Sequence, residues 1–422
     1  MTSAPNSRRI VFATIGSLGD LHPILALALE LRRRGHSVTV ASTPWYRSRV
    51  ESLGLAFRSL RPDWDPTDQA LIAQCEDLRT GPEVLFRKII LPHLADTFHD
   101  LMAATADADL MIAGELVYAA PLVAEKRTLR WVSEILSPCS FFSAHDPSLL
   151  VNIPAAYRLR NAGPAINRAL LKFGKLASRH WWAPVRNLRR QQGLRASCDP
   201  VFRDKFSPEL VLALFSSALA LPQPDWPSHT LQPGFVFLNS PEPPHPALAQ
   251  FLASGDAPIV FALGSTALHH PGNFYQESVR TATALGRRAI LLGANPQAFP
   301  ASPNLLTLPY APYEQVFPHA AAIVHQGGSG TTAQALRSGR PQLFVPFGWD
   351  QPDNAARVER AGAAIALSRA TYTAHSAQAA LHRLLTDPNF AQRAQALAGT
   401  LAAESALQQS GDAIDQLLAS AR

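Results

Sequence analysis

A glycine-rich turn behind an apolar run is the part of this sequence best suited to hold an anion. The run 321–324 leads into the turn, and the polar residues of the turn can donate hydrogen bonds. Glycines let the backbone come close to a ligand, while the free N–H groups and the dipole at a helix start attract negative charge. The turn comprises His325, Gly327, Gly328, Ser329, Gly330 and Thr331. These residues predict a phosphate-binding turn; a tight turn without a ligand is the simpler alternative.

A second loop, near the N-terminus, carries a carboxylate and an imidazole beside an expected helix start. Gly16 and Gly19 give this loop a partial dinucleotide fingerprint. The third glycine is missing, however, and no acidic residue follows the strand expected at 37–41, which disfavours a nicotinamide cofactor. Asp20 and His22 can instead accept a proton. An N-cap role for Asp20 and a solvated surface role for His22 are the simpler alternatives.

The loop after the apolar run 342–345 is suited to a sugar. Asp350 and Gln351 combine the acceptors and donors that can hold vicinal hydroxyl groups, and Trp349 adds an apolar face. A helix N-cap formed by Asp350 or Asp353 is the simpler alternative. Tyr310, expected between a strand and a helix, can stack on a base or fill the core.

Signals for a metal or for disulfides are weak. Two Asp-x-Asp triplets, 63–65 and 107–109, lie far from the glycine-rich turn, and we expect both to be surface turns. Cys75, Cys139 and Cys198 are too few and too scattered for a disulfide framework or a metal cluster. We therefore expect no metal and a cytoplasmic protein.

The elements that must position these loops alternate along the chain. Apolar runs typical of strands buried in a parallel sheet fall at 10–15, 37–41, 109–113, 129–132, 258–263, 289–292, 321–324 and 342–345. A helix is expected to begin near Pro23, whose fixed φ suits a first turn. Eight prolines between 221 and 246 predict a semi-rigid linker. Two doubly wound α/β domains that face each other across a cleft are the expected architecture.

Composition and charge set the broad class. The chain has 422 residues, of which 47% are hydrophobic and 17% charged, as in ordinary globular proteins. The sequence contains no apolar run of 18 residues, so we expect no transmembrane helix. We also expect no signal peptide. The net charge of +6 is uneven, because the stretch 147–198 holds ten Lys or Arg residues and no acidic residue. The positive charge therefore belongs to this one segment, which argues against nucleic acid as a partner and favours a partner that binds at this segment alone.

The basic stretch also carries apolar and aromatic residues. Within residues 157–195, Phe173, Trp181 and Trp182 are interleaved with the cations. A basic amphipathic helix of this kind can rest on an anionic membrane or receive an acidic lipid. A solvated helical hairpin in the wall of an acceptor site is the alternative. Both readings imply a hydrophobic acceptor.

The blocks 16–23 and 310–354 resemble the GT-B glycosyltransferases of family one, which include plant, sterol, antibiotic and rhamnolipid enzymes. Within that family the likeness is greatest to bacterial rhamnosyltransferases of the rhamnolipid type, on the triplets 225–227, 264–266 and 310–312. The resemblance implies a GT-B fold with two Rossmann-like domains. Residues 1–225 would bind the acceptor, 226–246 would be the linker and 247–395 would bind the nucleotide sugar. A helical segment, 396–422, would pack back on the N-terminal domain.

The resemblance also implies roles for single residues. Asp20 stands where the family places its catalytic base, with His22 as the second candidate. Many plant members hold the ribose through a glutamate where this chain has Ala333, a departure that weakens strict use of UDP and suits a deoxyribose donor. The donor-binding residues implied are Ser17, Gly19, Ser265, Tyr310, Ala311, His325, Gly327, Gly328, Ser329, Gly330, Thr331, Trp349, Asp350 and Gln351.

The implied reaction is an inverting transfer of a hexose to a hydroxyl group, as in a glucosyltransferase or rhamnosyltransferase of natural products or glycolipids. The donor would be of the UDP-glucose or dTDP-rhamnose type, with neither metal nor other cofactor. A GT-B nucleotide-sugar epimerase and a non-catalytic nucleotide-sugar-binding accessory protein are the alternatives. We expect a cytoplasmic location, at the inner face of the membrane if residues 157–195 dock there.

Overall fold

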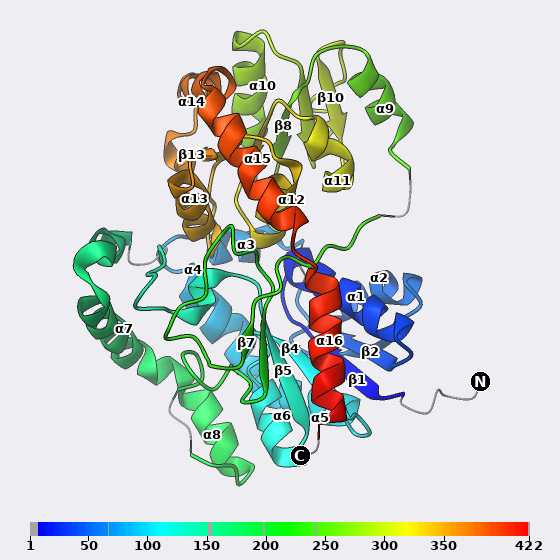
Figure 1. Ribbon diagram of the computed structural model, residues 1–422, viewed down its shortest axis with the longest axis vertical. Coiled ribbons are helices and arrows are strands. Elements are labelled where there is room, and N and C mark those ends of the chain that lie inside the picture. Colours follow the sequence, from blue (N-terminus) through cyan, green and yellow to red (C-terminus); the bar gives the residue numbers. More distant parts are fainter. Residues whose placement is uncertain (1–6, 66, 151–153, 197–198, 241–242, 421–422) are drawn as a thin grey trace.

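The computed structural model describes residues 7–65, 67–150, 154–196, 199–240 and 243–420. It contains two α/β domains that meet along one edge, the N-terminal one below and the C-terminal one above in Figure 1. Cys198 lies outside the described residues, as do residues 1–6 and residues 241–242 of the expected linker. Within the described residues, no helix combines the length and the apolarity required to cross a bilayer.

The N-terminal domain is built on a seven-stranded parallel sheet of order β3-β2-β1-β4-β5-β6-β7. Its strands are β1 (Arg9–Ala13), β2 (Ser37–Ser42), β3 (Ala56–Ser59), β4 (Leu110–Gly114), β5 (Arg130–Ile135), β6 (Leu210–Ala213) and β7 (Thr230–Leu231). Its helices are α1 (Leu18–Arg33), α2 (Arg47–Ser52), α3 (Gln69–Cys75), α4 (Gly81–Val84), α5 (Leu94–Ala104), α6 (Ala120–Arg127), α7 (Pro164–Ser178) and α8 (Ala183–Gln191). A π-helical stretch, η2 (Leu85–Ile90), and short 3₁₀ segments connect them.

The C-terminal domain has a six-stranded parallel sheet of order β10-β9-β8-β11-β12-β13. Its strands are β8 (Ile259–Ala262), β9 (Ala289–Leu292), β10 (Leu305–Leu308), β11 (Ala322–His325), β12 (Gln342–Phe344) and β13 (Ala364–Ala366). Its helices are α9 (Pro246–Ala253), α10 (Phe274–Ala284), α11 (Tyr313–Val316), α12 (Ser329–Ser338), α13 (Gln351–Arg360), α14 (Ala374–Thr386) and α15 (Pro388–Ala402).

Both sheets are apolar on both faces because helices cover both. In β1, Ile10 and Phe12 pack with α1 and α2, while Val11 and Ala13 pack with α5, α6 and α8. The C-terminal sheet repeats this arrangement, with α10 and α14 on one face and α9, α11 and α12 on the other. Such sheets explain why the strands appear in the sequence as continuous apolar runs, and all eight runs contain a strand.

The strand order places the polar loops. In each sheet the order reverses beside the first strand, between β1 and β4 and between β8 and β11. A crevice opens at such a switch point, beyond the carboxyl ends of the strands. The loops that follow β1, β4, β8 and β11 therefore gather at the facing edges of the two domains.

Two segments differ from expectation. Helix α1 begins at Leu18 rather than near Pro23, because Ser17 is an N-cap and forms a capping box with Asp20. The proline-rich stretch is not wholly a linker, since β7 pairs with β6 at the edge of the N-terminal sheet.

The last helix, α16 (Ala406–Ala419), lies beside α1 on the N-terminal domain (Figure 1). There Arg34 donates to Asp412 at 2.7 Å and to Asp415 at 2.8 Å. The chain therefore crosses between the domains a second time at its end.

Candidate active site

One cavity of about 1430 Å³ lies between the domains, and both supply its walls. The loop after β1 meets the start of α12 across it, where a Cβ placed on Gly330 would lie 3.9 Å from the Cα of Gly19. Asp20 and Ser329 line the same space. The predicted proton acceptor and the predicted phosphate-binding turn therefore share one crevice.

Asp20 is held by the capping box that starts α1. Its Oδ2 accepts from the Ser17 backbone N–H at 2.7 Å and from Ser17 Oγ at 3.1 Å. Gly16 leaves room for the carboxylate, because a Cβ there would lie 2.3 Å from Oδ2. Burial raises the pKa of Asp20 to about 6, the Ser17 hydrogen bonds oppose that rise, and the negative charges of Glu115 and Asp350 add to it. Asp20 is thus ionised at neutral pH and more basic than an exposed carboxylate.

His22 also lines the cavity, one turn along α1. Burial lowers its pKa to about 4, and the nearby Arg49 adds to that shift. The imidazole is therefore neutral at pH 7, which leaves it a weaker base than Asp20.

The glycine-rich turn presents the first amides of α12 to the cavity. Gly328 is the N-cap, and Ser329, Gly330 and Thr331 follow at the cavity wall. The amides of a first helical turn have no carbonyl partner within the helix, and they carry the positive end of the helix dipole. This arrangement suits a diphosphate.

His325 and Gly327 lie behind that turn and not at the cavity wall. The imidazole is fully buried; its Nδ1 accepts from the Gly327 N–H at 3.1 Å, and its Nε2 lies 3.0 Å from Gln342 Oε1. Nδ1 accepts, so the proton is on Nε2 and is donated to Gln342. Burial lowers the pKa of His325 to about 4. The expected direct donor to a phosphate is thus a neutral ring that supports the turn from within the domain.

Asp350 occupies the N-cap position of α13, yet its side chain caps nothing. Its Oδ2 instead accepts from Ser329 Oγ at 2.6 Å and from Asn354 Nδ2 at 2.7 Å. Burial raises the pKa of Asp350 to about 6. The carboxylate thereby joins the loop between β12 and α13 (residues 345–350), which we call the sugar loop, to the start of α12.

The neighbours of Asp350 are placed in the same loop. The Oε1 of Gln351 accepts from the Phe347 N–H at 2.7 Å and from the Gly348 N–H at 3.2 Å. Trp349 has a φ of 59° and packs against apolar residues of the N-terminal domain, including Cys75 and Val84. Both residues line the cavity. The loop is therefore ordered by contacts on both sides of the crevice.

The other expected donor residues also reach the cavity. Ser265 lies after β8, and Tyr310 and Ala311 lie after β10. Tyr310 is largely exposed at the rim of the cavity. Ser17 serves chiefly as the N-cap, with its Oγ accepting from the Gly19 N–H at 3.1 Å.

Several polar residues of the site carry no sequence signal that we recognised. Glu115, directly after β4, pairs with the nearly buried Lys205 at 3.2 Å, and both line the cavity. Gln326 donates to Thr331 Oγ1 at 3.3 Å, while its Oε1 is buried without a partner among the described residues. Their positions could have identified two of them. Glu115 directly follows β4 and Gln326 directly follows β11, and both strands border a switch point, where ligands bind.

Glu134, near the end of β5, is a buried carboxyl group beside the site. Neither of its oxygens has a hydrogen-bond partner among the described residues. Its Oε2 would lie 3.7 Å from a Cβ placed on Gly114 of the neighbouring strand. Burial raises the pKa of Glu134 well above its usual value, and the charges of Asp20 and Glu115 act in the same direction.

The N-terminal half of the cavity is mainly apolar. Side chains from η2, from α7 and from several loops and short segments cover it, and among them are Trp64, Phe86, Ile89, Tyr118, Leu136, Phe142, Leu170 and Trp181. A charged crevice at the domain edge thus opens into an apolar chamber. Within the described residues, no group of three or more His, Cys, Asp or Glu side chains could hold a metal ion. In the two Asp-x-Asp triplets, Asp65 accepts from Thr67 and Asp107 pairs with Arg9.

Two family models match the chain. Residues 10–134 match the glycosyltransferase family 28 N-terminal domain, and residues 291–414 match the erythromycin biosynthesis protein CIII-like C-terminal domain. Among curated proteins, the chain is 32% identical over 412 residues to O-mycaminosyltylonolide 6-deoxyallosyltransferase of Streptomyces fradiae, with 94% of each chain covered. It is 28% identical over 418 residues to vancomycin aglycone glucosyltransferase of Amycolatopsis orientalis, with 94% and 95% covered.

Solved structures show the same fold. The kitacinnamycin glycotransferase superposes with a TM-score of 0.72 at 22% identity, covering 98% of this chain and all of the other. The glycosyltransferase VinC in complex with dTDP gives 0.69 at 21% identity, with 97% and 99% covered. The two superpositions show that this chain shares the GT-B fold of glycosyltransferases.

Proposed function

The chain belongs to the GT-B glycosyltransferases of family one, and we propose that it moves a hexose from a nucleotide-diphosphate sugar to a hydroxyl group of a hydrophobic acceptor. One observation carries the proposal: the Asp20 carboxylate faces the start of α12 within a cavity whose other end is apolar. The charged end suits the donor and the acceptor hydroxyl. The apolar end suits the body of the acceptor.

In the proposed reaction Asp20 takes the proton of the acceptor hydroxyl as its oxygen attacks the anomeric carbon. The new C–O bond forms while the bond from the anomeric carbon to the diphosphate oxygen breaks on the opposite face, so that the configuration inverts. Ser17 holds Oδ2, which leaves Oδ1 for the proton. Negative charge grows on the departing diphosphate, where the amides of Ser329, Gly330 and Thr331 stabilise it more strongly than in the ground state. This route uses neither metal nor other cofactor.

The donor that we propose is of the UDP-glucose or dTDP-rhamnose type. Ala333 lies in the cavity wall with no group that could hold two ribose hydroxyls, which supports a deoxyribose nucleotide. Tyr310 would stack on the base, and Asp350 with Gln351 would bind the sugar hydroxyls. The rhamnolipid-type likeness and a location at the cytoplasmic side of a membrane remain part of the same proposal.

Thermal shift with UDP, dTDP and their sugars tests donor binding. A ligand at 100 times its dissociation constant should stabilise the protein by about 2.7 kcal/mol. Incubation of the best donor with hydroxylated apolar acceptors should then yield a glycosylated product. Donor consumption without any acceptor would favour the epimerase alternative. Donor binding without product from any acceptor would favour the accessory-protein alternative.

A further inference from the structure

Helix α7 projects from the body of the N-terminal domain. Figure 1 shows it at the outer edge of the molecule, outside the layers that cover the sheet. Only one narrow side of it faces the protein, where Asn167 is buried and donates to the carbonyl oxygens of Ala144 and Arg160 at 3.1 and 3.0 Å. Leu171 and Gly174, one and two turns on, are half-buried on the same side. Ser178, one turn further, is also half-buried, and the other residues of α7 are exposed to solvent.

That exposed surface is apolar to an unusual degree. Among the described residues nine large hydrophobic side chains are exposed, and five of them fall between residues 159 and 176. Ile166, Leu170 and Phe173 follow one another at spacings of four and three, so they form a single stripe along α7. Phe173 is 73% exposed and Leu176 is 67% exposed. Single exposed hydrophobic residues are common, whereas a contiguous stripe marks an interaction surface.

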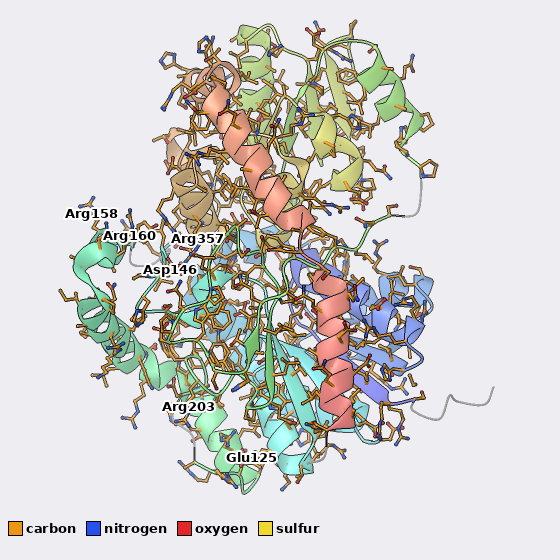
Figure 2. All side chains as sticks on the ribbon, in the orientation of Figure 1. Glu125, Asp146, Arg158, Arg160, Arg203 and Arg357 are labelled. Carbon is orange, nitrogen blue, oxygen red and sulfur yellow. The ribbon has the colours of Figure 1, made fainter. Side chains whose placement is uncertain are left out.

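Cations run beside the apolar stripe. Arg168, Lys172, Lys175 and Arg179 recur at spacings of four, three and four, which places them along one edge of the helix. Among the described residues only Lys175 of these four has an acidic partner, Asp199. Arg158 and Arg160, in the preceding 3₁₀ segment η5 (Pro154–Ala162), lie at the same outer edge (Figure 2). Helix α7 itself contains no acidic residue.

The apolar stripe continues into the cavity. Leu170 and Phe173, which are exposed on α7, also line the acceptor end of the cavity together with Ala177. A molecule that enters from this side therefore meets apolar side chains from the outer surface to the chamber. The helix is thus placed at the entrance that an apolar acceptor would use.

We propose that residues 157–179, the α7 ridge, dock on an anionic lipid bilayer and receive the acceptor from it. A projecting helix with an apolar stripe, flanking cations and no acid has the chemistry of an interfacial helix. The positive edge selects an anionic lipid surface as the occupant, since an apolar protein groove would leave the cations unpaired. This inference rests on the proposed function for the acceptor's nature, but the docking itself can be measured without any turnover.

Cosedimentation with vesicles tests the docking. The full-length protein should bind vesicles of phosphatidylcholine with phosphatidylglycerol at low salt, bind less at high salt, and bind pure phosphatidylcholine weakly. Leu176→Asp should lower binding to the anionic vesicles by about tenfold or more, since it removes exposed apolar surface and adds a negative charge. Leu221→Asp is the matched control, because Leu221 is 64% exposed and lies outside the ridge. That control should bind as the wild type does.

A second pair of variants tests the cations. Arg168→Gln/Lys172→Gln should lower binding about tenfold or more, and its remaining binding should depend less on salt. Arg383→Gln/Arg393→Gln removes the same charge from exposed positions in the C-terminal domain and should bind as the wild type does. Equal losses of vesicle binding in both double variants would show that binding depends only on the net charge of the protein, and would overturn the proposal for the α7 ridge.

Further outcomes separate this proposal from the proposed function. Absence of binding to anionic vesicles at low salt would refute the docking, whatever the activity. Loss of self-association in Leu176→Asp, measured by sedimentation velocity without any vesicle effect, would assign the ridge to a second copy of this chain and also refute it. Leu176 is not at the cavity, so Leu176→Asp should glycosylate a soluble acceptor as the wild type does. A wild type that binds vesicles but transfers no sugar would instead refute the proposed function.

Discussion

Burial raises the pKa of the Asp20 carboxyl group and its hydrogen bonds with Ser17 lower it, and the resulting value suits a general base. The pKa of about 6 means that the group is ionised at neutral pH and yet binds a proton more readily than an exposed aspartate. Asp20→Asn keeps the acceptor for Ser17 and removes the base. Turnover should fall by on the order of 10²–10⁴-fold, while calorimetry shows donor binding near that of the wild type. Near-normal rates would assign the role to His22 or to another group.

The same pKa predicts the pH profile. Asp20 must be ionised to accept a proton, so kcat/KM should fall as the pH drops through about 6. His22 would instead give an acid limb near 4. His22→Ala provides the control: its acid limb should stay near 6 if Asp20 is the base. A wild-type limb near 4 would contradict the assignment.

His325 acts on the donor only through the turn that it supports. His325→Ala leaves the Gly327 N–H and Gln342 Oε1 without their partner, each at a cost of about 1–3 kcal/mol if no water replaces the ring. We therefore expect a lower free energy of unfolding, measured by urea titration, and weaker binding of UDP or dTDP, measured by calorimetry. Equal affinity in the variant and the wild type would remove His325 from the donor site.

At the scale of elements, the central strands could be predicted because both of their faces are buried, so that each appears in the sequence as a short continuous apolar run. Each of the eight apolar runs overlaps a strand, and the strand expected before Tyr310 is β10, while β3, β6, β7 and β13 were not predicted. The edge strands β3, β7 and β13 are short or partly exposed and carry little apolar signal. The start of α1 was misplaced because Pro23 resembles an N1 residue, whereas the capping box of Ser17 sets the true start.

The site could be predicted only as far as its residues follow such strands. The loops of Asp20, Ser329 and Asp350 were found because glycines and polar residues directly follow apolar runs. Lys205 was missed since it comes from an irregular stretch, and only the fold brings it to Glu115. The inward orientation of His325 was missed as well, because the sequence gives its place at the end of β11 but not the partner Gln342 on β12.

The end of β5 offers a test of how the sheet tolerates a buried carboxyl group. The folded-state pKa of Glu134 is raised, so its stability contribution is complete below the unfolded-state pKa and is lost as the pH rises. Glu134→Gln keeps the shape and cannot ionise. Its free energy of unfolding should match the wild type near pH 4 and exceed it increasingly above that, by about 1.4 kcal/mol per pH unit until the folded-state pKa is passed. A difference between the two proteins that does not change with pH would contradict the burial argument.

At the scale of the whole molecule, a buried ion-pair network joins the domains at α13, the helix that follows the sugar loop. Arg357 of α13 donates to Asp353 of its own helix at 2.7 Å, to Asp146 of the N-terminal domain, and to Ser148 Oγ at 3.1 Å. Figure 2 shows Arg357 and Asp146 next to each other at the junction. Asp353 also accepts from the Leu149 N–H at 2.8 Å. The network therefore ties one side of the crevice to the helix that starts at Gln351.

Removal of the Arg357 cation should break this contact between the domains. Arg357→Met keeps the apolar stem but leaves Asp353 fully buried without its cation, so the free energy of unfolding should fall by about 3–5 kcal/mol. The Asp350 loop begins the same helix, so the KM for the donor should rise as well. Arg383→Met, at an exposed position of α14, is the matched control and should change either quantity little. A stable Arg357→Met with unchanged donor KM would show that the domains hold their relative position through apolar packing and the α16 crossover alone.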